Sequence, residues 1–497
     1  MRESTPPHVV VLGGGSAGWI TACLLHDRWR DRGGKVTLVQ SPAIGIIGVG
    51  EGSTPQLKAF FDHLGIAEAE WMAACDATYK LGIRFTGWGD PADGPESYFH
   101  PFPGPVDLHT QPAFEANCLL RRSRIDVPAH PDAWFLAAAL ASAGKGPLAG
   151  DDFPFAPSYG YHFDSHKLGN FLREWGTRRG IVHLKAMVAE VQLDAAGNVS
   201  ALLGDGGERI EGDVFVDCSG FRAVIAEQAL GARHLPFSEN LFADRAVVMP
   251  TAHGANELPQ TEAIAMRAGW RWRIPLTTRV GHGYVYSSCH ISDEAAEAEL
   301  RTATGAPADA EARFLSMRVG RLEDSWTRNC LAAGLAQGFI EPLEATALHL
   351  VITTALEFAA AYEQGGFTDA HRAHFNEAIA RKYESVRDYI VAHYRLNRRG
   401  DTDFWRENAA NEALSPALKD LMTAWFTRRD IKEALVNACG ASPAYPSMSW
   451  HCLFAGYGHF PEKGKLQPPP PAIPDRLAKT RAILEACERN FSDYRIA

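Results

Sequence analysis

A glycine-rich turn near the N-terminus is the first feature of this chain with chemical meaning. The apolar run 8–12 (HVVVL) leads directly into residues 13–18 (GGGSAG). Gly13, Gly15 and Gly18 fit the G-x-G-x-x-G spacing between a strand and a helix, where backbone amides and the helix N-terminus can hold a pyrophosphate. The sequence therefore predicts binding of FAD or NAD, with a purely structural glycine turn as the alternative.

Two charged side chains stand in otherwise apolar segments. Lys80 lies within residues 77–85 (ATYKLGIRF), where burying an ammonium group is costly unless it has a task. Glu344 lies within residues 338–348 (GFIEPLEATAL), just before a predicted helix. From spacing alone, Lys80 can also be a snorkelling surface lysine, and Glu344 an acid that stabilises the helix dipole.

Two indoles lie at alternate positions of a W-x-W-x-I-P run. Trp270 and Trp272 point to one face if the chain is extended there. Pro275 and Gly269 suit an edge strand, and a core strand is the alternative reading.

The segments around these residues predict a mixed α/β fold. Residues 9–39 read as strand, glycine turn, helix and strand, a βαβ opening that a Gly33-Gly34 stop divides. Turn signals at 195–198 and 204–207 predict an inserted antiparallel ribbon. Helical periodicity dominates the later part of the chain. The predicted helices cover residues 345–362, 369–397, 416–437 and 475–492.

The composition favours small-molecule partners. The chain has 497 residues and a formal net charge of -10, so it lacks the clustered basic residues that nucleic acids or anionic membranes attract. Neither a signal peptide nor a membrane span is expected. The nine cysteines contain no C-x-x-C pair, which favours reduced thiols in a cytoplasmic protein and argues against disulfides or a metal site.

Taken together, the four motifs resemble the flavin-dependent halogenases of the tryptophan halogenase family over essentially the whole chain. The resemblance implies an FAD-binding Rossmann-type fold of the flavoprotein monooxygenase (GR2-like) class, with an inserted antiparallel β-sheet and a mainly helical substrate-binding cap. We expect residues 1–345 to form the FAD-binding module with an interwoven β-sheet substrate region. Residues 346–497 would form a mainly helical region that completes the substrate pocket.

The resemblance also implies which residues hold FAD. An acid usually follows the second strand of the βαβ unit, but this chain has Gln40 there, whose amide can still bind ribose hydroxyls. The run 46–55 (IIGVGEGSTP) is similar to the family segment that wraps the flavin. The implied FAD contacts are Gly13, Gly15, Ser16, Ala17, Gly18, Gln40, Gly48, Val49, Gly50, Glu51, Val188, Leu335 and Leu348.

In the same way, the resemblance implies the chemistry. Reduced FAD, delivered by a separate flavin reductase, would react with oxygen and halide to give hypohalous acid, which Lys80 would hold or convert to a haloamine. Glu344 would orient the oxidant and accept the proton lost by the aromatic ring. The backbone amides of Thr346 and Ala347 would bind chloride or bromide.

The implied substrate site departs from that of the members that act on free tryptophan. His100, Pro101 and Phe102 match the family's H-P-F run, whose rings stack on an indole. Tyr445 is a further candidate, but Ala444-Tyr445 replaces a Phe-Trp pair and Ser449 replaces an Asn. We therefore expect indole or a substituted indole to be preferred to free tryptophan.

Two other functions stay open at this point. A single-component FAD-dependent aromatic hydroxylase would need NAD(P)H and no halide, and a catalytically lapsed flavin- or indole-binding protein would need neither. Lys80 and the W-x-W-x-I-P run argue against the hydroxylase, and Lys80 with Glu344 argues against the lapsed binding protein. A homodimer is a candidate assembly.

Overall fold

A computed structural model describes residues 5–42, 50–89, 95–155, 157–254, 256–440 and 443–496. The chain divides into two compact units. Unit 1 comprises Met1–Ala77, Phe163–Ser238 and Arg318–Glu384, and unit 2 comprises Thr78–His162, Glu239–Met317 and Ser385–Ala497. Each unit is thus assembled from three separate stretches of chain. Within the described ranges, no helix has the length and apolarity needed to cross a membrane.

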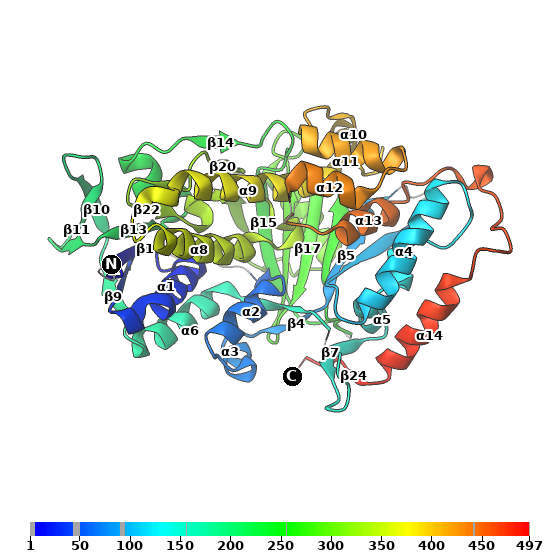
Figure 1. Ribbon diagram of the computed structural model, residues 1–497, viewed down its shortest axis with the longest axis horizontal. Coiled ribbons are helices and arrows are strands. Elements are labelled where there is room, and N and C mark those ends of the chain that lie inside the picture. The colour runs from blue at the N-terminus through cyan, green and yellow to red at the C-terminus, as the bar shows by residue number, and fades with distance from the viewer. Residues whose placement is uncertain are drawn as a thin grey trace. The chain divides into compact units, whose positions relative to one another are not determined.

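Unit 1 is built on a six-stranded sheet of order β21-β22-β13-β1-β2-β9, in which only β21 is antiparallel to its neighbour. The predicted βαβ opening is confirmed as β1 (His8–Leu12), α1 (Ser16–Trp29) and β2 (Lys35–Gln40). Gly33 adopts φ 88°, which ends the turn before β2 because glycine enters the left-handed region without strain. Helix α1 packs against β2 and against two further helices, α6 and α8 (Figure 1).

The predicted ribbon is also confirmed. Strands β10 (Val188–Leu193), β11 (Val199–Gly204) and β12 (Arg209–Glu211) form an antiparallel sheet joined by the two predicted turns. The other elements of unit 1 are β3 (Gly50–Gly52), α2 (Gln56–His63), α3 (Glu68–Ala74), α6 (Ser165–Arg178), β9 (Val182–Lys185), β13 (Val214–Asp217), β14 (His234–Pro236), β20 (Gly320–Leu322), β21 (Trp326–Thr327), β22 (Cys330–Ala332), β23 (Gly338–Phe339), α8 (Ala347–Gln364) and most of α9 (Arg372–Arg395).

Unit 2 contains a seven-stranded sheet of order β19-β15-β18-β17-β16-β5-β6. The W-x-W-x-I-P run forms β17 (Gly269–Pro275), which is paired on both sides, with β16 and β18. The edge-strand prediction for this run was therefore wrong. Pro275 is tolerated because it is the last residue of the strand, where a missing N–H costs the ladder little.

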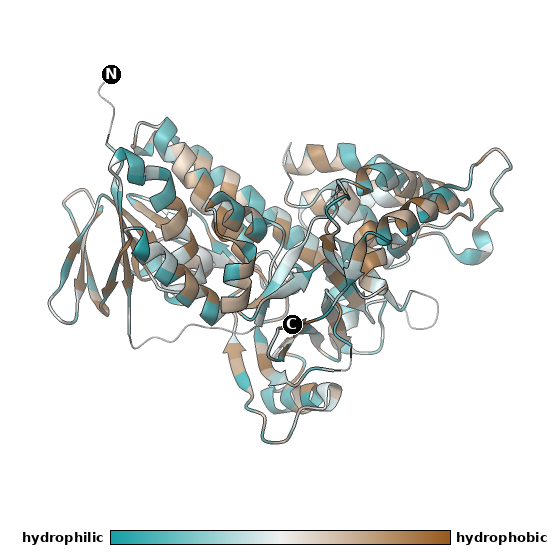
Figure 2. Cartoon of the chain, turned by 90° about the horizontal axis from the view of Figure 1, so that it is seen from below, coloured by the Kyte–Doolittle hydropathy of each residue, from teal (hydrophilic) through white to brown (hydrophobic). Residues whose placement is uncertain are grey.

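Helices cover parts of unit 2, and two helix predictions need correction. The helix predicted over 475–492 ends at Glu488, and residues 491 and 492 belong to a strand, β24. Residues 416–437 form two helices, α11 (Pro416–Phe426) and α12 (Ile431–Cys439), because the Asp430 side chain caps a new helix by accepting from two amides. Figure 2 shows hydrophilic and hydrophobic residues alternating along the helices, as one-sided packing requires. The remaining elements are β4 (Thr78–Lys80), β5 (Gly82–Thr86), β6 (Ser97–Pro101), α4 (Asp107–Arg122), α5 (Leu136–Ser142), β7 (Lys145–Ala149), β8 (Gly160–Asp164), β15 (Arg245–Thr251), β16 (Thr261–Met266), β18 (Val280–Tyr286), α7 (Asp293–Thr304), β19 (Arg313–Ser316), α10 (Asp403–Ala410), α13 (Ser447–Gly456), α14 (Arg476–Glu488) and β24 (Phe491–Asp493).

Candidate active site

The glycine turn of unit 1 has the geometry of a dinucleotide cradle. A Cβ atom on Gly13 would lie 2.1 Å from the Cys218 carbonyl oxygen, and one on Gly18 would lie 1.9 Å from the Gly13 carbonyl oxygen. A Cβ atom on Gly15 would meet no described atom within 4 Å. Two glycines thus allow tight packing, and the third leaves open space at the N-terminus of α1, where free amides favour a pyrophosphate. These residues fit FAD.

Gln40 lies against this turn. A Cβ atom on Gly14 would be 2.2 Å from the Gln40 Cδ atom, so the amide rests directly over the glycine backbone. Its Oε1 atom is 3.2 Å from Nε2 of His183, which holds the side chain at the end of β2. Gln40 therefore occupies the predicted position, and its contact with a ribose stays a prediction.

Glu51 on β3 is linked to the same turn through Ser165. The Ser165 side chain hydrogen-bonds the Glu51 carboxylate, and the Ser16 hydroxyl donates to the Ser165 carbonyl oxygen at 3.0 Å. Burial raises the pKa of Glu51 to about 7, the nearby charge of Asp164 adds to that rise, and the Ser165 hydrogen bond opposes it. Gly50 lies beside it on β3, whereas Gly48 and Val49 lie outside the described residues.

We expect Glu51→Gln to stabilise the protein in alkaline but not in acidic solution. Because the folded-state pKa is raised from 4.5 to about 7, the folded state binds the proton more tightly, and stability falls as pH rises through this window. A neutral Gln removes a penalty that reaches on the order of 3 kcal/mol above pH 7. The melting temperature of the variant should therefore exceed that of the wild type at pH 8 and match it near pH 4.5. Equal shifts at both pH values would contradict this assignment.

The other predicted FAD contacts come from separate parts of unit 1. Leu335 belongs to a 3-10 turn, η5 (Gly334–Ala336), and a Cβ atom on Gly334 would lie 2.7 Å from the Cβ atom of Ala17. This turn therefore lies beside the start of α1. Leu348 is buried on α8, which packs on α1 and on η5, and Val188 packs against the core cluster that contains Leu12.

Glu344 lies in a sharp turn before α8. It ends a 3-10 turn, η6 (Pro342–Glu344), and is 2% exposed. The next residue, Ala345, adopts φ 55° and ψ 38°, a left-handed conformation that costs a non-glycine residue about 1 kcal/mol. Thr346 occupies the N-cap position without a side-chain capping bond, and Ala347 is the exposed first residue of the helix. Their amides therefore belong to the first turn, which lacks intrahelical partners and favours anions.

Lys80 is fully buried at the end of β4 in unit 2. Its Nζ atom is 5.5 Å from the centre of the Phe102 ring, within the range of a cation–π interaction. Phe102 directly follows β6, the strand that carries His100 and Pro101. Strand β6 pairs with β5 along its length. The reading of Lys80 as a snorkelling surface lysine is therefore wrong.

The two indoles of β17 are buried on one face of the strand, as predicted. The centres of the Trp270 and Trp272 rings are 6.1 Å apart. The Trp272 ring lies over Gly283 of the neighbouring strand, where a Cβ atom would be 2.0 Å from the ring. A glycine on β18 thus makes room for the second indole.

Two of the predicted substrate residues, His100 and Tyr445, lie in a cluster of rings that includes Tyr389, a residue that the sequence reasoning missed. Tyr389 on α9 stacks on Tyr445, with ring centres 3.7 Å apart and planes at 15°, and the His100 ring lies 5.8 Å from that of Tyr389. Ser449 is 3.0 Å from Nε2 of His100 and accepts a hydrogen bond from Tyr389 through its carbonyl oxygen. In the sequence, the only sign that Tyr389 joins this ring cluster is that it lies four residues before His393 on the predicted helix, so that both rings fall on one face.

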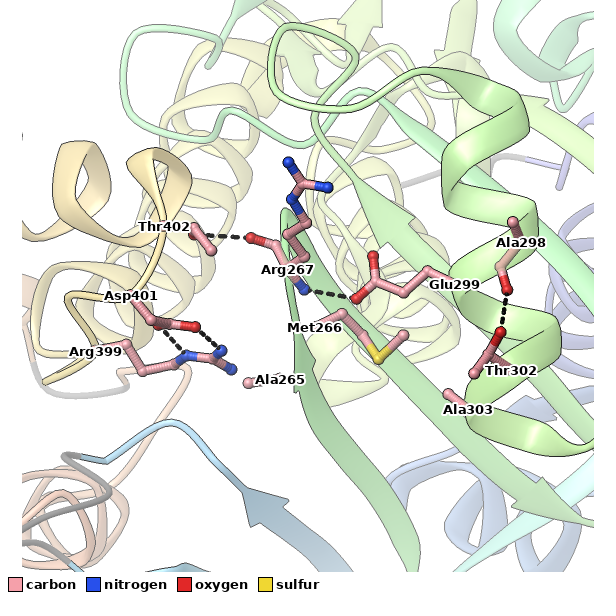
Figure 3. Close-up of a pocket in the computed structure, with 10 residues that line it drawn as sticks. All are labelled: Ala265, Met266, Arg267, Ala298, Glu299, Thr302, Ala303, Arg399, Asp401 and Thr402. Carbon is pink, nitrogen blue, oxygen red and sulfur yellow. Dashed lines mark hydrogen bonds and ion pairs between the residues drawn. The ribbon is translucent and has the colours of Figure 1, made fainter.

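A surface pocket of about 570 Å³ lies elsewhere in unit 2, between β16, α7 and the segment before α10. Its polar groups bind one another: Arg399 pairs with Asp401, and the backbone of Arg267 bonds to Glu299 and Thr402 (Figure 3). None of the predicted site residues lines it. This pocket therefore adds nothing to the candidate site.

The parallel sheet, the glycine turn and the inserted antiparallel strands define an FAD-binding Rossmann-type flavoenzyme. A family model for tryptophan halogenases matches residues 8–467. The chain therefore belongs to the tryptophan halogenase family and is a flavin-dependent enzyme.

Individual relatives span nearly the whole chain. Tryptophan 6-halogenase SttH of Streptomyces toxytricini is 35% identical over 481 residues, which cover 90% of this chain and 89% of that protein. Its crystal structure matches with a TM-score of 0.86 over 98% of both chains. Tryptophan 7-halogenase RebH of Lentzea aerocolonigenes is 34% identical over 80% of this chain and 78% of its own. The structure of BrvH, a flavin-dependent halogenase from Brevundimonas sp. BAL3, is 32% identical with a TM-score of 0.82, covering 98% of this chain and 97% of its own.

Proposed function

We propose that this enzyme halogenates an electron-rich aromatic ring, most readily indole or a substituted indole, with chloride or bromide. When bound in reduced form, FAD would activate molecular oxygen, which is the oxidant that converts halide to hypohalous acid. The observation that carries the proposal is a fully buried lysine, Lys80, in a chain that also has the FAD cradle and the buried Glu344 turn.

In this proposal each residue has one task. The Lys80 ammonium donates a hydrogen bond to hypohalous acid and holds it away from water. As the carbon–halogen bond forms, the halogen–oxygen bond breaks, and the departing hydroxide takes a proton from the Lys80 ammonium and leaves as water. Glu344 accepts the ring proton, and proton exchange with solvent restores both side chains. The amides of Thr346 and Ala347 hold the halide by the same charge–dipole attraction that binds anions at other helix N-termini.

The chemistry of the ring cluster supports an uncharged substrate. Its members His100, Tyr389, Tyr445 and Ser449 offer rings and hydroxyl groups, and the Tyr389 hydroxyl is already bonded to Ser449. A zwitterionic amino acid would need a cation and an anion as partners, and it loses hydration where they are lacking. Tyr389, Tyr445 and Ser449 all come from residues 346–497, which supports the proposed role of that region in the substrate pocket.

We expect kcat/KM for indole to exceed that for free tryptophan by about tenfold or more, because desolvating an unpaired charged group costs at least 1–2 kcal/mol. The product should carry the halogen at C3, the most reactive ring position. Chromatography with mass spectrometry and NMR of the product would measure both. A higher kcat/KM for tryptophan with a benzene-ring product would overturn the substrate proposal.

The same assay separates the halogenase from a single-component hydroxylase. We propose that a separate flavin reductase delivers reduced FAD through solution, so NADH alone should not bleach the FAD of the purified enzyme. Halogenated product should require halide and either a reductase or chemically reduced FAD. A hydroxylated product formed without halide, or rapid bleaching by NAD(P)H alone, would favour the hydroxylase.

A further inference from the structure

The strand that carries Lys80 is bonded to the end of the W-x-W-x-I-P strand through the hydroxyl group of Thr78. Thr78 lies two residues before Lys80 on β4, so the two side chains share one face of the strand. The Thr78 hydroxyl donates to the Pro275 carbonyl oxygen at 2.6 Å. Both Thr78 and Pro275 are buried.

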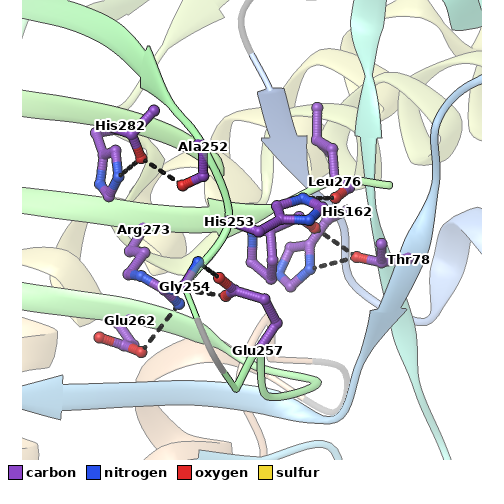
Figure 4. A network of polar contacts seen from close by, with 12 residues as sticks. Thr78, His162, Ala252, His253, Gly254, Glu257, Glu262, Arg273, Leu276 and His282 are labelled. Atoms are coloured by element: carbon purple, nitrogen blue, oxygen red, sulfur yellow. Dashed lines mark hydrogen bonds and ion pairs between the residues drawn. The ribbon is translucent and has the colours of Figure 1, made fainter. Parts of the chain in front are cut away.

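His162 completes this contact from the opposite strand. It faces Thr78 in the antiparallel pair of β4 and β8 and is fully buried. Its Nδ1 atom lies 3.1 Å from the Thr78 hydroxyl oxygen, and its Nε2 atom lies 2.8 Å from the hydroxyl oxygen of Thr261. Strands β4 and β16 thus meet at one imidazole, and Thr78 links it to the end of β17 (Figure 4).

The hydrogen bonds assign one tautomer to this imidazole. A carbonyl oxygen can only accept a hydrogen bond, so the Thr78 hydroxyl donates its one proton to the Pro275 carbonyl oxygen. The same hydroxyl must therefore accept a hydrogen bond from His162. Nδ1 therefore carries the proton, and the bare Nε2 accepts from Thr261. Burial lowers the pKa of His162 well below its ordinary value, and the positive charges of Lys80 and Arg273 lower it further. His162 is therefore neutral and adds no positive charge beside the Lys80 ammonium.

Lys80 is held on its other side as well. The amide of Leu81 donates to the carbonyl oxygen of Pro259 at 2.7 Å. An ion pair between Glu257 and Arg273, both partly buried, links the segment before Pro259 to β17 (Figure 4). The chain is therefore held two residues before the lysine, by the Thr78 side chain, and immediately after it, by the Leu81 amide.

We propose that His162, through its Nδ1–H bond to Thr78, is a positioning residue that sets the location of the Lys80 ammonium relative to the W-x-W-x-I-P strand. The inference rests on the proposed function, in which Lys80 holds hypohalous acid. It predicts a defect in the use of the oxidant and not in the binding of FAD or of the aromatic substrate.

The decisive comparison is Thr78→Val against Thr78→Ser. Valine keeps the shape but removes the hydrogen bonds of the hydroxyl, to Tyr494 as well as to Pro275 and His162. A misplacement of the order of 1 Å should lower kcat by roughly 10- to 100-fold with KM for the aromatic substrate unchanged. Serine restores the hydroxyl and should recover most of the rate. Hypohalous acid, trapped in solution by a β-diketone scavenger, should rise in Thr78→Val because less of it reaches the ring. Thr423→Val, an exposed hydroxyl on α11 bonded to its own helix, is the matched control.

A second pair of variants keeps the test decisive if Thr78→Val does not fold. An asparagine at 162 places an amide donor where Nδ1 lies, and a glutamine places one where Nε2 lies. His162→Asn should therefore retain about tenfold more halogenation than His162→Gln. Equal losses in the two, or a folded Thr78→Val with wild-type kcat, would overturn the inference. Lys80→Ala is measured in parallel. If Lys80→Ala still halogenates, the proposed function fails. If Lys80→Ala is inactive while Thr78→Val is fully active, only the positioning role fails.

Discussion

Lys80→Ala is expected to lower halogenation by at least about 10³-fold while FAD binding and the oxidation of reduced FAD continue. The lysine is fully buried in unit 2, whereas the glycine cradle, Gln40 and Glu51 belong to unit 1. Losing the ammonium removes the group that holds the oxidant and should not disturb the cradle. Product formation by mass spectrometry, FAD affinity by fluorescence and oxygen uptake by electrode would measure the three effects separately.

Lys145→Ala is the matched control for this experiment. Lys145 is also in unit 2, but its ammonium donates to the Phe491 carbonyl oxygen on the β7–β24 pair and has no part in the proposed chemistry. It should retain full activity. Loss of FAD binding in Lys80→Ala, or a normal rate of halogenation, would contradict the role assigned to the lysine.

Glu344→Gln should lower the rate of halogenation by roughly 10²-fold, the scale expected for a positioned proton acceptor. Glutamine has the size of glutamate and can hydrogen-bond in the same turn, so the left-handed Ala345 and the start of α8 should persist. What the variant lacks is a group that can take the ring proton. Single-turnover rates with reduced FAD and saturating halide would measure the effect.

Glu357→Gln serves as the control for that variant. Glu357 lies on the same helix, α8, and pairs with Lys382 at 3.2 Å on a partly exposed face. It should leave the rate unchanged. An unaltered rate in Glu344→Gln would remove this carboxylate from the mechanism. A marked drop in melting temperature together with the loss of rate would make its role structural.

The sequence by itself determined the class of fold and the family, because these depend on residues whose neighbours are close in the chain. The glycines at 13 and 18 are needed where backbone meets backbone, and the spacing of three residues already specifies a turn between strand and helix. The βαβ opening, the inserted ribbon and the alternating indoles at 270 and 272 follow from local periodicity in the same way.

Only the tertiary structure decided what lies around the predicted residues. No local pattern distinguishes an interior β17 from an edge strand, or shows that Asp430 starts a second helix, because both depend on which elements pair and cap. Tyr389 meets Tyr445, and Thr78 meets both His162 and Pro275, across separations of 56, 84 and 197 residues. Each compact unit consists of three separate stretches of chain, so contacts between residues far apart in sequence form only when folding brings those stretches together.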